Sequence, residues 1–285
     1  MDGQLSRTRW ARTTVFPRRA ALGAFAALGL GLVACQPAQS ALGVAEATDA
    51  LVEATGATQA LVLTARAIEL GTSFAAGDDP ETSAAAIGAA LLVDLPCAIV
   101  AVDGATVSVE HGADCAVMGR ALAGSQLITV VANDDEGIVV DHEWTGLTDG
   151  VVAVDGWAEA VWLDGDEGRT VLHEISWTRL ADERTGVGYT EVFQSPAAGG
   201  LAEGVLLEGL AFWTGLRGEW SLELYGADVR WVDAVPQAGL YVLDTPYSKS
   251  VHLSFQRLDP VSIAVTVAGP VRSYDFAVDP SGELL

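Results

Sequence analysis

Apolar side chains recur at roughly helical spacing early in the chain and alternate with polar ones further along. Between residues 41 and 70 they predict one or two helices, because Gly56 interrupts an otherwise helical pattern. Asp79-Pro80-Glu81 is typical of a helix start, with a capping Asp, Pro at the first helical position and an acid in the first turn. This second helix is expected to stop before Pro96, because the residue before a proline disfavours helical backbone.

After Pro96 the pattern becomes that of β-strands. Segment 97–110 predicts a hairpin with Asp103-Gly104 as its two-residue turn, in which Val102 faces Ala105. Further strands are expected at regular spacing, separated by acidic or Gly-containing turns. They are 122–132, 138–145, 151–163, 169–179, 187–194, 205–213, 219–232, 239–243, 250–258, 261–267 and 271–278. The expected fold is mainly β: an antiparallel meander, open barrel or extended repeating sheet, preceded by one to three short helices.

An internal repeat lies within the β part. Trp144-Thr145-Gly146-Leu147 recurs as Trp213-Thr214-Gly215-Leu216, and the likeness extends over about 136–162 and 203–231. Two related strand–turn–strand units favour a continuous repeating sheet over unrelated domains. Asp155-Gly156 alone suggests a turn, but the second copy has none there, so we expect one long strand with a Gly bulge in each copy. We interpret the tryptophans as packing anchors of the sheet rather than ligand stackers.

The first 34 residues have the composition of an export signal. Five Arg precede an apolar run, 20–34, that is shorter than the about 20 residues a membrane span needs. The run ends in Leu32-Val33-Ala34-Cys35, which resembles the bacterial lipobox. By that resemblance the signal peptide is 1–34, Cys35 is lipidated and 35–40 is a tether. The alternative is an ordinary signal peptide with a chance Cys. By the same resemblance, Gln36 in place of the Asp that marks inner-membrane retention implies the outer membrane.

Composition changes the picture of partners. Without residues 1–34 the chain has 10 Lys+Arg against 37 Asp+Glu, a formal charge of −27. Such acidity argues against nucleic acid and against electrostatic docking on anionic lipid. An acidic solvated face is the simplest interpretation of the charge. Apart from Cys35, the cysteines are Cys97 and Cys115, and an even pair in an exported chain predicts a disulfide.

A family resemblance covers residues 95 to 177, nearly a third of the chain. Its residues are Pro96-Cys97, the following hairpin, Cys115, Gly119-Arg120, the step at Ala123-Gly124, Trp144, Gly156, Trp162, His173 and Trp177. In these features the chain resembles a group of uncharacterised predicted bacterial lipoproteins of myxobacterial type. The resemblance implies the disulfide and the β-sheet. It implies no catalytic residue, because the shared motifs are structural.

Candidate chemistry is sparse. His142 and His173 could share one face of the sheet and are weak candidates for a metal site, although two polar side chains on a solvated or half-buried face are the simpler interpretation. Residues 164–168 have acids at alternate positions without the rest of a calcium loop. The sequence contains no HExxH, GxSxG, P-loop or dinucleotide motif, so we expect no catalytic residue and no cofactor. The sequence does not exclude a catalytic pair among the many carboxylates, because it gives no distances between them.

Three functions follow as hypotheses. The first is a lipid-anchored envelope protein with a structural or interaction role, at the outer membrane on its periplasmic face or at the cell surface, and without enzymatic activity. The second is a carrier of an apolar ligand, held in a half-barrel with the helices of 41–93 as a lid. The third is a metal-dependent hydrolase that would need His142, His173 or an acid pair to converge in a cleft.

Overall fold

The protein folds into one long antiparallel sheet with two helices. The computed structural model describes residues 40–285 except 113, 118, 135–136, 163–167, 198–199 and 201. The expected signal peptide, the lipidation residue Cys35 and the tether up to residue 39 lie outside the described residues. No helix among the residues described combines the length and the apolar character that crossing a bilayer requires.

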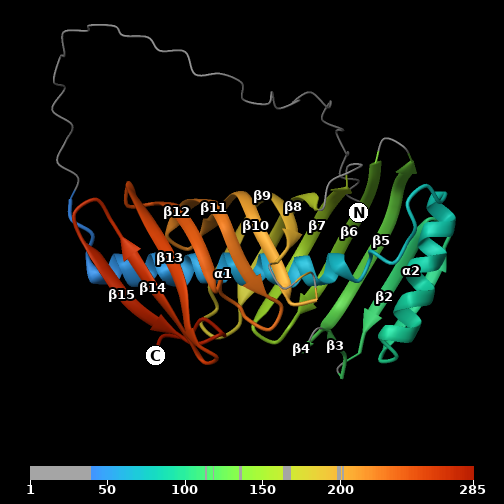
Figure 1. Ribbon diagram of the computed structural model, residues 1–285, viewed down its shortest axis with the longest axis horizontal. Coiled ribbons are helices and arrows are strands. Elements are labelled where there is room, and N and C mark those ends of the chain that lie inside the picture. Colours follow the sequence, from blue (N-terminus) through green and yellow to red (C-terminus); the bar gives the residue numbers. More distant parts are fainter. Residues whose placement is uncertain are drawn as a thin grey trace, which may run out of the picture. The chain divides into compact units, whose positions relative to one another are not determined.

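The expected fold class is confirmed as an open antiparallel meander preceded by two helices (Figure 1). Thirteen strands form one sheet in the order β1-β2-β5-β6-β7-β8-β9-β10-β11-β12-β13-β14-β15, and β3 and β4 form a separate small hairpin. The elements are α1 (Val44–Glu69), α2 (Pro80–Asp94), β1 (Ala98–Asp103), β2 (Thr106–His111), β3 (Ala116–Val117), β4 (Arg120–Ala121), β5 (Ala123–Asp134), β6 (Gly137–Thr148), β7 (Val152–Trp162), β8 (Arg169–Arg179), β9 (Thr185–Pro196), β10 (Gly204–Gly215), β11 (Gly218–Arg230), β12 (Ala238–Thr245), β13 (Lys249–Asp259), β14 (Ser262–Ala268) and β15 (Ser273–Val278).

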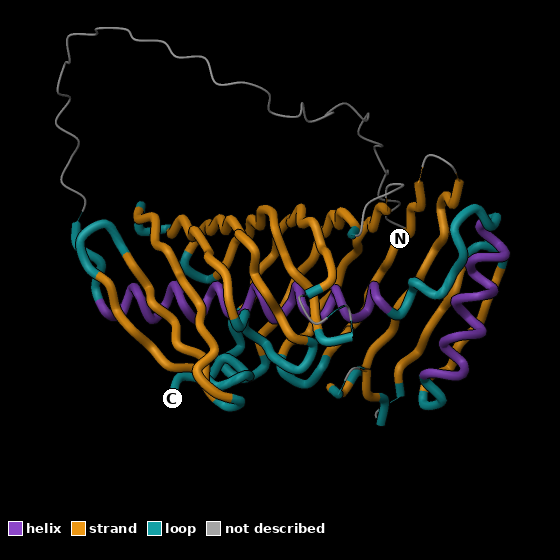
Figure 2. The backbone as a smooth tube through the Cα atoms, viewed as in Figure 1, coloured by secondary structure: helices purple, strands orange, loops and turns teal. Residues whose placement is uncertain are grey.

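Helix α1 runs across the strands along the inner face of the sheet (Figure 2). All residues from Glu53 to Ile68 are buried, so the helix is enclosed on every side rather than on one stripe. Its start is fixed by Glu46, whose carboxylate accepts a hydrogen bond from the Gly43 N–H at 2.8 Å. Because most of this segment is Ala, Leu, Val and Thr, it can pack against sheet on all sides.

Gly56 does not divide α1 into two helices. A Cβ at this position would lie 2.9 Å from the Trp177 ring, closer than side chains pack. The glycine therefore provides room for a buried tryptophan of β8, and the cost of glycine inside a helix, about 1 kcal/mol, is offset by that packing. Of the two possibilities left open by the sequence, the single helix is correct.

Helix α2 starts and ends as its sequence predicts. Asp79 accepts from the Thr82 N–H at 3.0 Å and Pro80 is the first helical residue. The helix packs on β1, β2 and β5 through a face that includes Ile87 and Leu91. This helix covers the β1 end of the sheet, beyond the reach of α1 (Figure 1).

The β1–β2 hairpin has a different register from the predicted one. The turn residues are Gly104 and Ala105, so Val102 pairs with Val107 and Asp103 pairs with Thr106. Only Gly104 has a positive φ, +56°, which suits the first central position of a type II′ turn. The prediction that Val102 faces Ala105 was therefore wrong by two residues, because Asp103 continues the strand.

The two repeat segments each form an antiparallel pair, β6 with β7 and β10 with β11, but the registers differ: Trp144 pairs with Gly156, whereas Trp213 pairs with Trp220. Strand β7 continues through Gly156, as the comparison of the two copies predicted, with φ at +135°. The bulge predicted there was wrong for the first copy, where the extra residue lies on β6 between Trp144 and Leu147, whereas the second copy has its bulge on β11. A Cβ at Gly156 would lie 2.3 Å from the Glu174 carbonyl oxygen, so the neighbouring strand requires glycine there. The repeated tryptophans Trp144 and Trp213 are both buried on the inner face.

Candidate functional site

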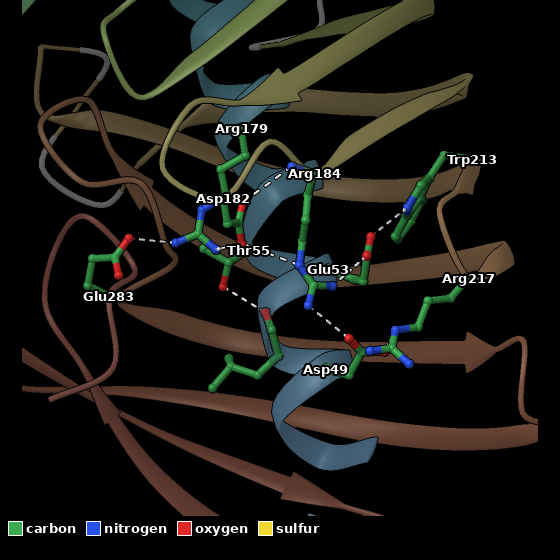
Figure 3. A network of polar contacts seen from close by, with 10 residues as sticks. Asp49, Glu53, Thr55, Arg179, Asp182, Arg184, Trp213, Arg217 and Glu283 are labelled. Carbon is green, nitrogen blue, oxygen red and sulfur yellow. Dashed lines mark hydrogen bonds and ion pairs between the residues drawn. The ribbon is translucent and has the colours of Figure 1, made fainter. Parts of the chain in front are cut away.

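Acidic side chains of α1 bind the loops that join the strands (Figure 3). Asp49 and Glu53, one helical turn apart, accept from Arg184 at 2.9 and 2.7 Å. Arg217 contacts Asp49 at 3.1 Å, and the Trp213 indole donates to Glu53 at 3.4 Å. An acid pair does converge here, but guanidinium groups occupy it. The cluster is therefore a clamp that fixes α1 to the β8–β9 and β10–β11 connections.

The carboxylates of this clamp are buried, so their charge depends on the arginine beside them. Burial raises the pKa of Glu53, and the hydrogen bond from Arg184 lowers it. Burial and the hydrogen bond to Asp49 also raise the pKa of Tyr247, to about 12. Charges held away from water depend on their partners, because an uncompensated buried charge costs several kcal/mol.

Similar ion pairs continue along the whole helix. Glu46 at its start pairs with Lys249 at 2.5 Å. Further along, Arg66 pairs with Asp149 at 3.0 Å, and Glu69 at its end pairs with Arg169 at 2.9 Å. Helix α1 is thus tied to strands or loops at both ends and in the middle, by groups far apart in sequence.

The two candidate histidines, His142 and His173, do lie on the same inner face. Trp144 lies between them, with ring centroids 6.0 Å from His142 and 6.3 Å from His173. His142 Nδ1 is 3.0 Å from Gln126 Nε2, and His173 Nε2 is 3.1 Å from Thr64 Oγ1. Neither imidazole reaches the surface.

Burial, helped by the nearby charge of Arg169, lowers the pKa of both His142 and His173 to about 3. Both rings are therefore neutral at physiological pH. The described residues contain no group of three or more His, Cys, Asp or Glu placed to hold a metal ion. In this arrangement the histidines pack and hydrogen-bond beneath α1.

The predicted disulfide between Cys97 and Cys115 is present, with a Cα–Cα distance of 5.3 Å. It joins the residue before β1 to the residue before β3. The bond therefore fixes the small β3–β4 hairpin to the end of the main sheet where α2 packs.

The inner face has little free space. A hollow of about 10 Å³ lies beside Trp177 and Trp213 under α1. A second hollow, about 160 Å³, lies at the end of α1 between Trp162, Arg169 and Gln194. Sites for drug-sized ligands measure roughly 300–1,000 Å³. The half-barrel that an apolar-ligand carrier would need exists, but α1 fills it.

The outer face of the sheet, turned away from α1, combines exposed aromatic rings with carboxylates. One cross-strand row reads Trp157, Glu174, Tyr189 and Phe212, on β7 to β10 in order. The three aromatic residues are 40%, 42% and 48% exposed. Exposed aromatic side chains grouped on adjacent strands are typical of an interaction surface.

A second row lies two residues away along the same strands. It reads Glu159, Leu172, Glu191, Leu210 and Glu223, on β7 to β11 in order. Acidic and apolar side chains thus alternate from strand to strand. We name the nine residues of these two rows the aromatic–acidic face.

The sequence predicted the Cys97–Cys115 disulfide and a shared face for His142 and His173. The preferred interpretation of a solvated or half-buried face was wrong, because both histidines are fully buried. The clamp and the aromatic–acidic face were not predicted. Strand alternation predicts which residues point outward, but only the register between strands shows that they form rows.

Comparison of the chain with protein-family models, with curated proteins and with solved structures found no match in any of the three.

Proposed function

We propose that this protein is a lipid-anchored interaction protein of the bacterial envelope, which binds a basic, partly apolar polypeptide on its aromatic–acidic face. The anchor rests on the lipobox ending at Cys35. The observation that carries the binding role is the row of exposed rings, Trp157, Tyr189 and Phe212, set beside carboxylates.

Charge segregation supports a basic partner. Of the ten Lys and Arg after residue 34, at least eight form ion pairs with carboxylates of the protein. None of the nine residues of the aromatic–acidic face is basic. The face therefore attracts cations, and its rings offer apolar area and cation–π contacts to Lys and Arg.

The spacing of the carboxylates indicates how such a partner would lie. Glu159, Glu191 and Glu223 are on β7, β9 and β11, two strands apart in each step. Neighbouring strands are about 4.8 Å apart, so these carboxylates repeat at roughly 10 Å. A peptide in the polyproline II conformation has three residues per turn and rises about 3.1 Å per residue, so cations at every third residue lie on one side and repeat at roughly 9 Å, close to that spacing.

The other two hypotheses have less support. A carrier of apolar ligands would require α1 to leave the inner face, against its ion pairs and the burial of Glu53 to Ile68. A hydrolase built on His142 and His173 would need access to rings that are fully buried. Wild-type protein that took up a fluorescent fatty acid saturably, at one site, would favour the carrier instead.

A peptide-binding experiment tests the proposal. The probe is a fluorescein-labelled 12-residue peptide with Lys at every third position and Leu or Thr between, and its counterpart has Glu in place of Lys. By fluorescence anisotropy the Lys peptide should bind, more weakly at high salt, and the Glu peptide should not. Trp157→Ser with Phe212→Ser should weaken binding by about tenfold or more.

The matched control removes apolar area elsewhere. Leu258 and Val261 are 59% and 67% exposed at the β13–β14 turn, away from the aromatic–acidic face, and Leu258→Ser with Val261→Ser should leave binding unchanged. Equal loss in both double variants, or equal binding of the two peptides, would refute the binding role. The anchor is tested separately: Cys35→Ser should abolish incorporation of labelled palmitate, and unchanged incorporation would refute it.

A further inference from the structure

The hollow of about 160 Å³ at the end of α1 is a built polar site, separate from the face assigned to the proposed function. It lies where α1 ends, between the end of β7, the start of β8 and the end of β9. Its lining residues are Glu69, Thr72, Trp162, Gly168, Arg169, Gln194, Ser195, Pro196 and Val205. The volume suits roughly five water molecules or one small organic molecule.

Arg169 makes most of the polar contacts in the hollow, but its charge is paired with that of Glu69. Its guanidinium donates to Glu69 at 2.9 Å, to Gln194 Oε1 at 2.9 Å and to the Ala65 carbonyl at 3.3 Å. Its carbon Cζ lies 5.5 Å from the centre of the Trp162 ring. Because Glu69 balances the charge of Arg169, the described lining of the hollow favours neither an anion nor a cation.

The side-chain amide nitrogen of Gln194 has no hydrogen-bond acceptor among the described residues. The bond from Arg169 Nε to Oε1 fixes the orientation of the amide. Its Nε2 then has no hydrogen-bond partner among the described residues, although the side chain is only 2% exposed. A buried donor left unpaired costs about 1–3 kcal/mol, and because Gln194 lines the hollow, an occupant whose acceptor oxygen reaches Nε2 would recover that energy.

We propose that this hollow binds a small neutral polyhydroxylated molecule, between glycerol and a monosaccharide in size. One hydroxyl oxygen would accept from Gln194 Nε2, and the hydroxyls of Thr72 and Ser195 line the same space. The Trp162 ring provides the apolar wall on which the C–H face of a polyol packs. A fully apolar ligand would leave the Gln194 amide unpaired, and a charged ligand would find no unpaired counter-charge among the described lining residues.

The chain offers a matched pair of variants for the test. Gln194→Glu keeps the acceptor for Arg169 and removes the Nε2 donors with almost no change of shape. Gln237 accepts from Arg257 Nε at 3.3 Å in the same way, outside the hollow, so Gln237→Glu is the control. Both variants are checked for folding by thermal unfolding before binding is measured.

The probes are glycerol, glucose and N-acetylglucosamine, followed by saturation-transfer NMR and by the shift of the Gln194 side-chain amide in the folded protein. We expect at least one probe to bind saturably and to shift that amide, with binding at least tenfold weaker in Gln194→Glu and unchanged in Gln237→Glu. If Gln194→Glu does not fold, Thr72→Val replaces it, with the same expectation of weaker binding.

Two outcomes would overturn the proposal. In the first, none of the three probes binds saturably and the Gln194 amide exchanges magnetisation with water alone, which makes the hollow a hydration site. In the second, a probe binds equally to Gln194→Glu and Gln237→Glu, which places it elsewhere. Neither outcome depends on the peptide-binding experiment, because the aromatic–acidic face lies on the opposite side of the sheet.

Discussion

Mild acid should destabilise this protein through His142 and His173. Both imidazoles are buried beneath α1, and their pKa values fall from about 6.5 in the unfolded chain to about 3 in the folded protein. A lowered pKa in the folded state means that the unfolded chain takes up the protons first as the pH falls. The stability these neutral rings contribute is therefore complete above about pH 6.5 and is lost progressively down to about pH 3.

The magnitude follows from the size of the shift. At about pH 5, roughly 1.5 units below the unfolded pKa, each unfolded imidazole is charged and each folded one is still neutral. At about 1.36 kcal/mol per unit, each histidine then costs about 2 kcal/mol of unfolding free energy, and the two together about 4 kcal/mol. A loss of that size is a large fraction of the 5–15 kcal/mol typical of a folded domain.

Urea unfolding followed by tryptophan fluorescence, at about pH 8 and about pH 5, measures this loss. The quantity compared is the fall in unfolding free energy between the two pH values, so that contributions from carboxylates cancel between wild type and variants. His142→Gln with His173→Gln should reduce the fall by about 4 kcal/mol, and His173→Gln alone by about half as much. His252→Gln, which removes a solvent-exposed imidazole on β13, is the control.

The reasoning fails if the double variant and the wild type lose equal stability between the two pH values. It also fails if His252→Gln reduces the fall as much as His173→Gln does.

Three further changes probe the fold by the same urea assay. Arg184→Ala leaves the buried carboxylate of Glu53 without its cation and should cost about 3 kcal/mol. Arg217→Ala, at a 56% exposed side chain, should cost less than about 1 kcal/mol, and similar losses in the two variants would contradict the clamp. Replacing Cys97 and Cys115 with Ser opens a loop of 18 residues and should cost about 3 kcal/mol, and no loss would contradict a constraining disulfide. Gly56→Ala should destabilise by about 1 kcal/mol although alanine favours helices, because the new Cβ lies 2.9 Å from a buried ring; a gain in stability would show that the ring moves aside.

The strands were predictable because each carries its own signal. From β5 to β15 every strand corresponds to one predicted segment, with bounds that differ by a few residues. Alternation of apolar and polar residues reports a sheet that is buried on one side, and acidic or glycine turns mark where each strand ends. Pairing of sequence neighbours needs no long-range information, so the meander itself could be predicted as well.

The place of α1 could not be read from its sequence. A helix with apolar residues on all sides indicates burial, but not which surface encloses it. The hypothesis of an apolar-ligand carrier treated the helices as a lid over a groove, whereas α1 lies buried against the inner face of the sheet. Gly56 shows the difficulty, because locally it signals a break, and only the Trp177 ring from a distant strand explains it.

The functional surfaces were hidden for a related reason. The hollow joins Glu69, Arg169 and Gln194, and the clamp joins Asp49 to Arg184. Each arises where α1 meets strands or loops that follow a hundred or more residues later. Pairs of that kind have no spacing rule, so carboxylates and arginines that look like scattered surface charges turn out to be partners.

The order of synthesis means that α1 is made long before the strands that bury it. Ribosomes release α1 early, yet its hydrogen-bond partners Tyr241 and Ser281 lie 183 and 222 residues further on. Successive hairpins can zip together as the chain emerges, but the helix has no complete shelter until the final strands arrive. Newly made chains should therefore pass through a stage in which the apolar helix α1 is only partly buried. A chaperone that binds unfolded chains would protect the protein from aggregation at that stage.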